Sequence, residues 1–258
     1  MYYFQRSALL TKCNLIMKYI VEYQDELQIS IEKIRKKIEL SKNKKLNPYT
    51  ISHQILDLIL SIGTGNNDND NDNDKLIYIS DRIRKFHDFY GWMAKGKSIN
   101  LGVCSGTFFR SKDYLSIPPK DRSGKKIDKH SNFGVHVEHS IPIKVLRNIL
   151  VKNINANSKP EDVFTYLITY SICTGFSRVN ERNGINYGFG SMHPDFNENG
   201  TPPRTEAVKP FIRYSNDVEI YSMLTGKKIE PTETLKNLTA ETKKFDIFKW
   251  NFIQHHYI

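Results

Sequence analysis

The chain has 258 residues, of which 39% are hydrophobic, so it can form a packed core and is neither a disordered chain nor a fibrous repeat. Lys and Arg outnumber Asp and Glu by 38 to 28, which gives a net charge of +10. This excess favours a polyanionic partner, because basic side chains near phosphates release condensed counterions. No apolar run approaches the roughly 20 residues that cross a bilayer, so we expect a cytoplasmic protein without a membrane partner.

The three cysteines, Cys13, Cys104 and Cys173, lie far apart and form no Cys-x-x-Cys pair. This pattern predicts reduced thiols that are buried as small apolar residues. It argues against a structural zinc site built from thiolates.

The first part of the chain has a helical pattern. Apolar residues recur at three- and four-residue steps over residues 7–40, which predicts two amphipathic helices, and a third is expected over 49–62. Residues 65–74 then alternate Asn and Asp without an apolar side chain, so we expect a flexible linker there. An EF-hand calcium loop is not expected, because the Gly and the closing Glu of that motif are missing.

The linker divides the chain into two parts. We expect a helical N-terminal region over residues 1–75 and a second domain over residues 76–258. The first helix of the second domain should have Ser80 or Asp81 as its N-cap and run to Met93.

Residues 105–133 combine several Lys and Arg residues with Pro and Gly, which predicts a basic loop. The next stretch, residues 134–142, alternates apolar and polar side chains as in a strand with one buried face. His136 and Glu138 would share the other face of this strand, and Pro142 would end it.

Helical patterns follow over residues 143–150 and 160–172. A short strand or turn is expected over residues 173–176. A short helix capped by Ser177 should come directly after it.

The segment Val137-Glu138-His139-Ser140-Ile141-Pro142 resembles the acidic-His-apolar-Pro signature that opens the ββα-metal fold of HNH nucleases, including several restriction enzymes. The resemblance implies an α+β protein with a ββα-metal core near residues 133–186. It also implies that Glu138 binds a divalent metal ion, Mg²⁺ or Mn²⁺, and that His139 is the general base that activates water.

In the same family a His or Asn on the following helix completes the metal site. Asn180 is the first choice for this ligand and Asn183 the second, because residues 174–183 look like a turn followed by a short helix. Their distance along the chain from Glu138 departs from the usual spacing of the family.

The chemistry explains why Glu138 and His139 are useful neighbours. A neutral imidazole can take a proton from water near neutral pH, and a divalent cation can stabilise the charge of the transition state. Adjacent residues of a regular strand point to opposite faces, so the two side chains serve one phosphate only if the strand bends there.

The reaction expected from these features is sequence-specific cleavage of double-stranded DNA by a type II restriction enzyme-like endonuclease. The side chains expected to contact DNA are Lys125, Lys126, Lys129, Arg182, Arg204 and Arg213. A homodimer is the default expectation, because palindromic sites are read by two-fold symmetric proteins.

Two alternatives stay open. The first is a metal-independent DNA glycosylase or lyase that acts through Tyr187, His193 and Asp195. The second is a non-catalytic DNA-binding protein in which Glu138 and His139 are an ordinary surface pair.

Overall fold

The computed structural model describes residues 31–63 except 33, 69–90, 108–117, 135–177, 184, 186–188, 208–214, 217–235, 238 and 245–257. These residues form an α+β structure with a five-stranded mixed sheet, which confirms the predicted fold class. The helices are α2 (Pro48–Leu60), α3 (Asn69–Tyr90), α4 (Lys112–Leu115), α5 (Ile143–Asn153), α6 (Pro160–Tyr170), the 3-10 helix η4 (Asp246–Phe248) and α9 (Trp250–Tyr257), and residues 31–40 other than 33 are also helical. The strands are β1 (Phe109–Ser111), β2 (Val135–His139), β3 (Cys173–Ser177), β4 (Ile220–Ser222) and β5 (Lys228–Ile229).

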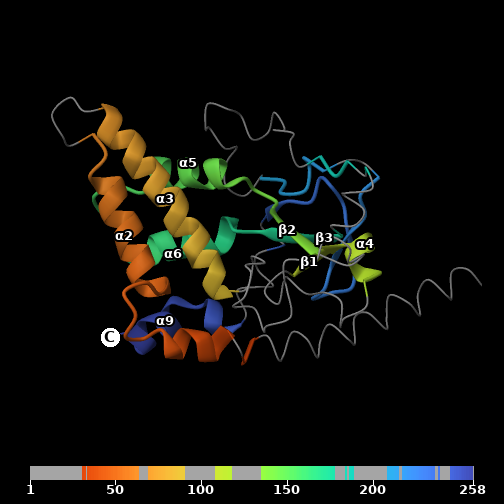
Figure 1. Cartoon of the computed structure of the whole chain (residues 1–258), viewed down its shortest axis with the longest axis horizontal. Coiled ribbons are helices and arrows are strands. Elements are labelled where there is room, and N and C mark those ends of the chain that lie inside the picture. The colour runs from red at the N-terminus through yellow and green to blue at the C-terminus, as the bar shows by residue number, and fades with distance from the viewer. Residues whose placement is uncertain are drawn as a thin grey trace, which may run out of the picture.

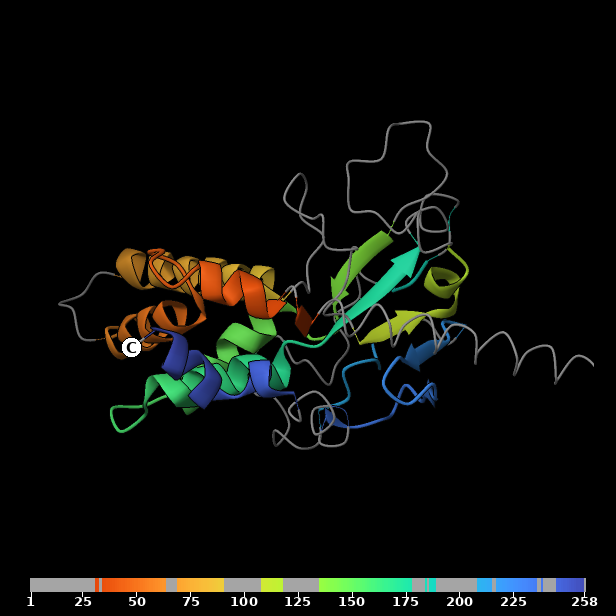
Figure 2. The same cartoon turned by 90° about the horizontal axis from the view of Figure 1, so that it is seen from below.

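The helices α2, α3, α5, α6 and α9 gather at one end of the molecule and the sheet lies at the other (Figures 1 and 2). The strand order is β2-β3-β1-β4-β5. The pair β1/β3 is parallel and the other neighbouring pairs are antiparallel. In the part of the chain that the structure describes, no helix is both long and apolar enough to cross a membrane.

The prediction of a flexible linker over residues 65–74 is wrong for residues 69–74, which form the first turns of α3. Acidic side chains are favoured at a helix N-terminus because they interact well with the helix dipole. Asp72 also accepts a hydrogen bond from the backbone of Gly63 (3.2 Å) and pairs with Lys75 (3.1 Å), whose Nζ donates to the carbonyl of Ser61 (2.7 Å). Polar contacts therefore stabilise the start of α3 without apolar burial, and residues 65–68 lie outside the described part.

The helix predicted from Ser80 or Asp81 therefore starts earlier, at Asn69. The expected domain boundary after residue 75 falls inside α3. The helices and the sheet also share one buried apolar cluster, which includes Ile55 of α2, Phe86 of α3 and Phe176 of β3.

The strand and helices around the acidic-His segment are confirmed. In β2, Val135 and Val137 are buried while His136 and Glu138 are half-buried, which is the alternation expected of a strand. The chain then leaves the sheet at Ser140 for α5 and α6, and returns in β3. The short helix expected after Ser177 falls on residues 178–183, outside the described part.

Gly175 allows β3 to pack closely against α4. A Cβ atom at this position would lie 2.9 Å from Cδ2 of Tyr114, whose side chain is fully buried. A glycine is therefore needed here because of close packing and not because of its backbone angles.

Candidate catalytic and metal-binding site

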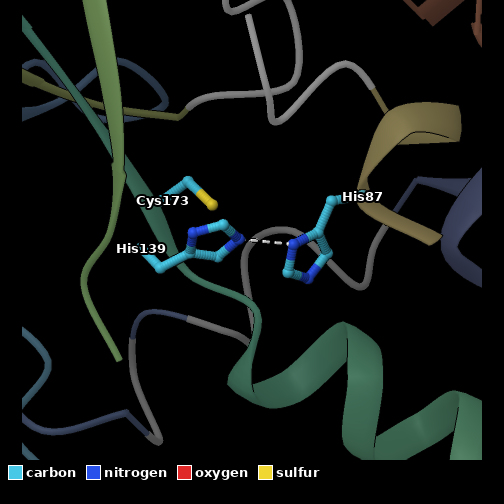
Figure 3. A group of neighbouring side chains, drawn as sticks. All are labelled: His87, His139 and Cys173. Atoms are coloured by element: carbon cyan, nitrogen blue, oxygen red, sulfur yellow. Dashed lines mark hydrogen bonds between the residues drawn. The ribbon is translucent and has the colours of Figure 1, made fainter. Parts of the chain in front are cut away.

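Strand pairing brings His139 and Cys173 together. His139 is the last residue of β2 and lies directly opposite Cys173, the first residue of β3. Residues directly opposite in an antiparallel pair have neighbouring side chains on the same face. His87 approaches from the last turn of α3, and Figure 3 shows its ring directed at the His139 ring with the Cys173 sulfur beside them.

The three side chains form a compact cluster of two nitrogens and one sulfur. His87 Nδ1 lies 2.6 Å from His139 Nε2, which makes a short hydrogen bond between the two imidazoles. One ligand atom from each of His87, His139 and Cys173 lies within 4.8 Å of the others. One imidazole of the pair must donate and the other accept, so the accepting ring must be neutral.

The surroundings favour neutral imidazoles. Burial, followed by the positive charges of Arg84 and Arg213, lowers the pKa of His139 to about 4. Burial, followed by the charge of His139, lowers the pKa of His87 well below its ordinary value. Both rings therefore present lone pairs at neutral pH, as a base or a metal ligand requires.

Glu138 belongs to the other face of β2. One of its carboxylate oxygens lies 3.3 Å from a guanidinium nitrogen of Arg213, and the other lies 3.6 Å from His136 Nε2. A second nitrogen of Arg213 donates to the backbone carbonyl of His139 at 3.3 Å. Arg213 therefore contacts the end of β2 twice, through the carboxylate of Glu138 and through the backbone carbonyl of His139.

This arrangement differs from the role expected for Arg213. The sequence suggests a contact with DNA, whereas the structure leaves only 4% of the side chain exposed and engages it with Glu138 and His139. A direct contact with a base edge does not fit this burial, because the guanidinium would have to leave both partners.

The bend that would bring Glu138 and His139 to one face is not found in residues 135–139. The register between β2 and β3 continues without interruption to His139, so the two side chains point to opposite faces. Glu138 and His139 both lie at the end of β2. A phosphate can contact both side chains only at this strand end.

Ser140, the first residue after β2, is fixed by buried hydroxyl groups. Its Oγ lies 2.8 Å from Thr174 Oγ1 and accepts a hydrogen bond from the Tyr214 hydroxyl at 3.2 Å. These contacts fix the strand end that carries Glu138 and His139.

His87 is the member of this cluster that sequence reasoning missed. It shares the buried face of α3 with Ile83, Phe86 and Tyr90, at helical spacing. A histidine on an otherwise apolar helix face was the available signal. The burial expected for Cys173 is confirmed, but its two histidine neighbours could not be read from its position in the chain.

Most of the other predicted site residues lie outside the described part of the chain. These are Asn180, Asn183, Lys125, Lys126, Lys129, Arg182 and Arg204, together with His193 and Asp195 of the alternative site.

Tyr187, the remaining residue of the alternative site, is described. It is buried and donates a hydrogen bond to Asp113 at 2.8 Å, beside a cavity of about 680 Å³ that is also lined by Asp217 and Glu219. The three carboxyl groups in this lining outnumber its one basic side chain, Lys112, which disfavours a nucleic-acid backbone. The geometry therefore gives the glycosylase or lyase alternative no support at Tyr187.

Comparisons with protein-family models, with curated proteins and with solved structures gave no match.

Proposed function

We propose that this protein is a metal-dependent DNA endonuclease that hydrolyses phosphodiester bonds with His139 as the general base. The observation that carries the proposal is the 2.6 Å hydrogen bond between His87 and His139 at the end of β2. A base that is itself held by a second side chain is the arrangement used to activate water or a hydroxyl group.

The hydrogen bond assigns different tasks to the two ring nitrogens of His139. Its Nε2 is engaged by His87, so Nδ1 is the nitrogen that takes the proton of the attacking water. This requires that Nε2 carries the ring proton and donates it to Nδ1 of His87. His87 is therefore a positioning residue, because it fixes the orientation and the tautomer of the base.

The resemblance to HNH nucleases supports the same assignment. The acidic-His-apolar-Pro segment begins at the end of β2, which carries Glu138 and His139, and β3 pairs with β2 in the antiparallel sense, as two strands of a ββα-metal core would. The helix that would complete this core falls outside the described residues.

Glu138 would hold the divalent ion, Mg²⁺ or Mn²⁺, together with Asn180 or Asn183. Its side chain is 23% exposed and offers the carboxylate oxygens that these cations prefer. The bound ion would stabilise negative charge on the phosphate during hydrolysis.

Double-stranded DNA is the proposed substrate because the chain carries a net charge of +10. Sequence-specific cleavage, as by a type II restriction enzyme, and a homodimeric state are part of the same proposal.

Digestion of mixed plasmid DNA with Mg²⁺, with Mn²⁺ and with EDTA tests the proposal directly. His139→Ala should lower kcat by about 10²- to 10⁴-fold and leave DNA affinity nearly intact, because a general base acts mainly in the transition state. Glu138→Ala should shift the metal titration to higher Mg²⁺. Exposed residues provide matched controls, His255→Ala for the imidazole and Glu161→Ala for the carboxylate.

Three outcomes would contradict the proposal. Full cleavage by His139→Ala would show that His139 is not the general base. Cleavage in EDTA would favour the metal-independent alternative. Tight, salt-sensitive DNA binding without cleavage in either metal would indicate a non-catalytic DNA-binding protein.

A further inference from the structure

We propose that His87, His139 and Cys173 form a binding site for Zn²⁺ or a similar transition-metal ion, and that occupation of this site switches off the nuclease. The first half of the proposal stands on the cluster alone. The second half rests on the proposed role of His139 as the general base.

The donor atoms select the class of metal. Two imidazole nitrogens and one thiol sulfur converge from α3, β2 and β3, with all three atoms within 4.8 Å of one another. Nitrogen and thiolate ligands suit Zn²⁺ and related transition metals, whereas Mg²⁺ prefers oxygen. The cluster therefore differs in selectivity from Glu138, on the other face of β2.

Small movements suffice to seat an ion. Tetrahedral zinc with ordinary bond lengths places its nitrogen ligands about 3.3 Å apart and a nitrogen and a sulfur about 3.6 Å apart. The present separation of His87 Nδ1 and His139 Nε2 is 2.6 Å, so the rings must part by several tenths of an ångström. The widest separation, 4.8 Å at most, must close by about 1 Å, which rotation of the Cys173 side chain can supply.

The protons balance in a defined way. The thiol of Cys173 loses one proton to solvent when its sulfur binds the ion. The proton between the two imidazoles must leave the nitrogen that binds the metal, and it moves to the other nitrogen of the same ring. Binding therefore releases one proton, and each imidazole stays neutral.

The same movement of the ring proton prevents His139 from acting as the general base. When Nε2 of His139 binds the metal, its ring proton sits on Nδ1, the nitrogen that would otherwise accept the proton of water. A metal-bound His139 cannot perform the proposed catalytic step while the ion is present. The inhibition follows from the tautomer alone and needs no movement of DNA or of the strand.

Nearby positive charge makes the site suited to reversible binding. Arg84 and Arg213 act on His139, and their positive charge disfavours a cation beside it. One thiolate and two neutral imidazoles leave a net charge of +1 after Zn²⁺ has bound. We expect weaker binding than at structural zinc sites with several thiolates, and therefore release by chelators.

Titration of the full-length protein with Co²⁺ tests the site through a signal that is independent of activity. One equivalent should produce the thiolate-to-cobalt charge-transfer absorption with release of about one proton, and Zn²⁺ should displace the Co²⁺ and abolish the absorption without further proton release. The absorption should be lost in Cys173→Ser and kept in the matched controls Cys13→Ser and Cys104→Ser. Loss of intensity in His87→Gln would show that α3 contributes a ligand.

Cleavage in excess Mg²⁺ tests the inhibition. For each variant, the rate with added Zn²⁺ is divided by its own rate without it. Added Zn²⁺ should lower the rate of the wild type at least tenfold. It should leave the rate of Cys173→Ser nearly unchanged, with a ratio near one.

The two proposals fail in different ways. A wild-type protein without the thiolate absorption would overturn the zinc site whatever the cleavage assay shows. A protein that gives the absorption but never cleaves DNA would overturn the nuclease proposal and leave the metal site in place. Equal inhibition of wild type and Cys173→Ser would overturn the link between them.

Discussion

Acid should destabilise this protein through its buried histidines. His139 has a pKa of about 4 in the folded chain and about 6.5 when unfolded, so the unfolded chain takes up a proton first as the pH falls. A depressed folded-state pKa means that stability is greatest above pH 6.5 and is lost progressively down to about pH 4. The full loss is roughly 3 kcal/mol, and about 2 kcal/mol of it should be lost by pH 5. His87, whose pKa is also lowered by burial, acts in the same direction.

Urea unfolding at pH 7.5 and pH 5, with EDTA present and circular dichroism as the signal, measures this loss. The free energy of unfolding of the wild type should fall by about 2 kcal/mol more than that of His139→Gln, because Gln cannot take up the proton. His255→Gln, at an exposed position of α9, should fall as much as the wild type. Equal losses in wild type and His139→Gln would refute the assignment of acid sensitivity to this pair.

Two further changes test the packing of the sheet and the contact with DNA. Gly175→Ala should lower the free energy of unfolding by about 1–3 kcal/mol, because its Cβ would lie 2.9 Å from the buried ring of Tyr114. An unchanged thermal midpoint would contradict the close packing. Replacement of Lys125, Lys126 and Lys129 by Ala should weaken binding to all DNA sequences alike. It should also reduce the slope of log affinity against log salt by up to about 0.9 per lost phosphate contact. An unchanged slope would show that these residues do not contact the DNA backbone.

Local patterns predicted the elements that surround the site. The alternation of buried valines with His136 and Glu138 gave β2, because successive side chains of a strand face opposite sides. Pro160 at the first position of α6, followed by Asp162 accepting from the backbone of Lys159, marks a helix start within a few residues. Such signals are short in range and can be read from one segment.

The same reasoning misread the Asn/Asp run for a physical reason. A segment without apolar side chains cannot bury surface, which is the usual basis for expecting disorder. In α3, Asp72 instead accepts a hydrogen bond from the backbone N–H of Gly63 and forms an ion pair with the ammonium of Lys75. Electrostatic stabilisation of a helix end depends on the turn before it, which composition does not reveal.

The cluster of His87, His139 and Cys173 could not be predicted because its contacts are long in range. His87 and His139 are 52 residues apart, and their meeting depends on how α3 packs against the sheet. His139 meets Cys173 only in one register of β2 with β3, and two helices separate these strands in the chain. A shift of one residue would turn one of the two side chains to the opposite face.

In the proposed scheme, the alternation of β2 lets one strand end serve two kinds of metal ion. Glu138 presents oxygen on one face, and His139 presents nitrogen beside a sulfur on the other, so neighbouring residues have opposite metal preferences. A hard ion at Glu138 leaves the ring proton of His139 where the hydrogen bond to His87 holds it, and the base keeps a free lone pair on Nδ1. A softer ion on Nε2 sends that proton to Nδ1 and removes the lone pair. In the proposed scheme, the position of one proton on His139 therefore decides whether the strand end cleaves DNA, and the hydrogen bond to His87 holds that proton on Nε2 until a softer ion binds there.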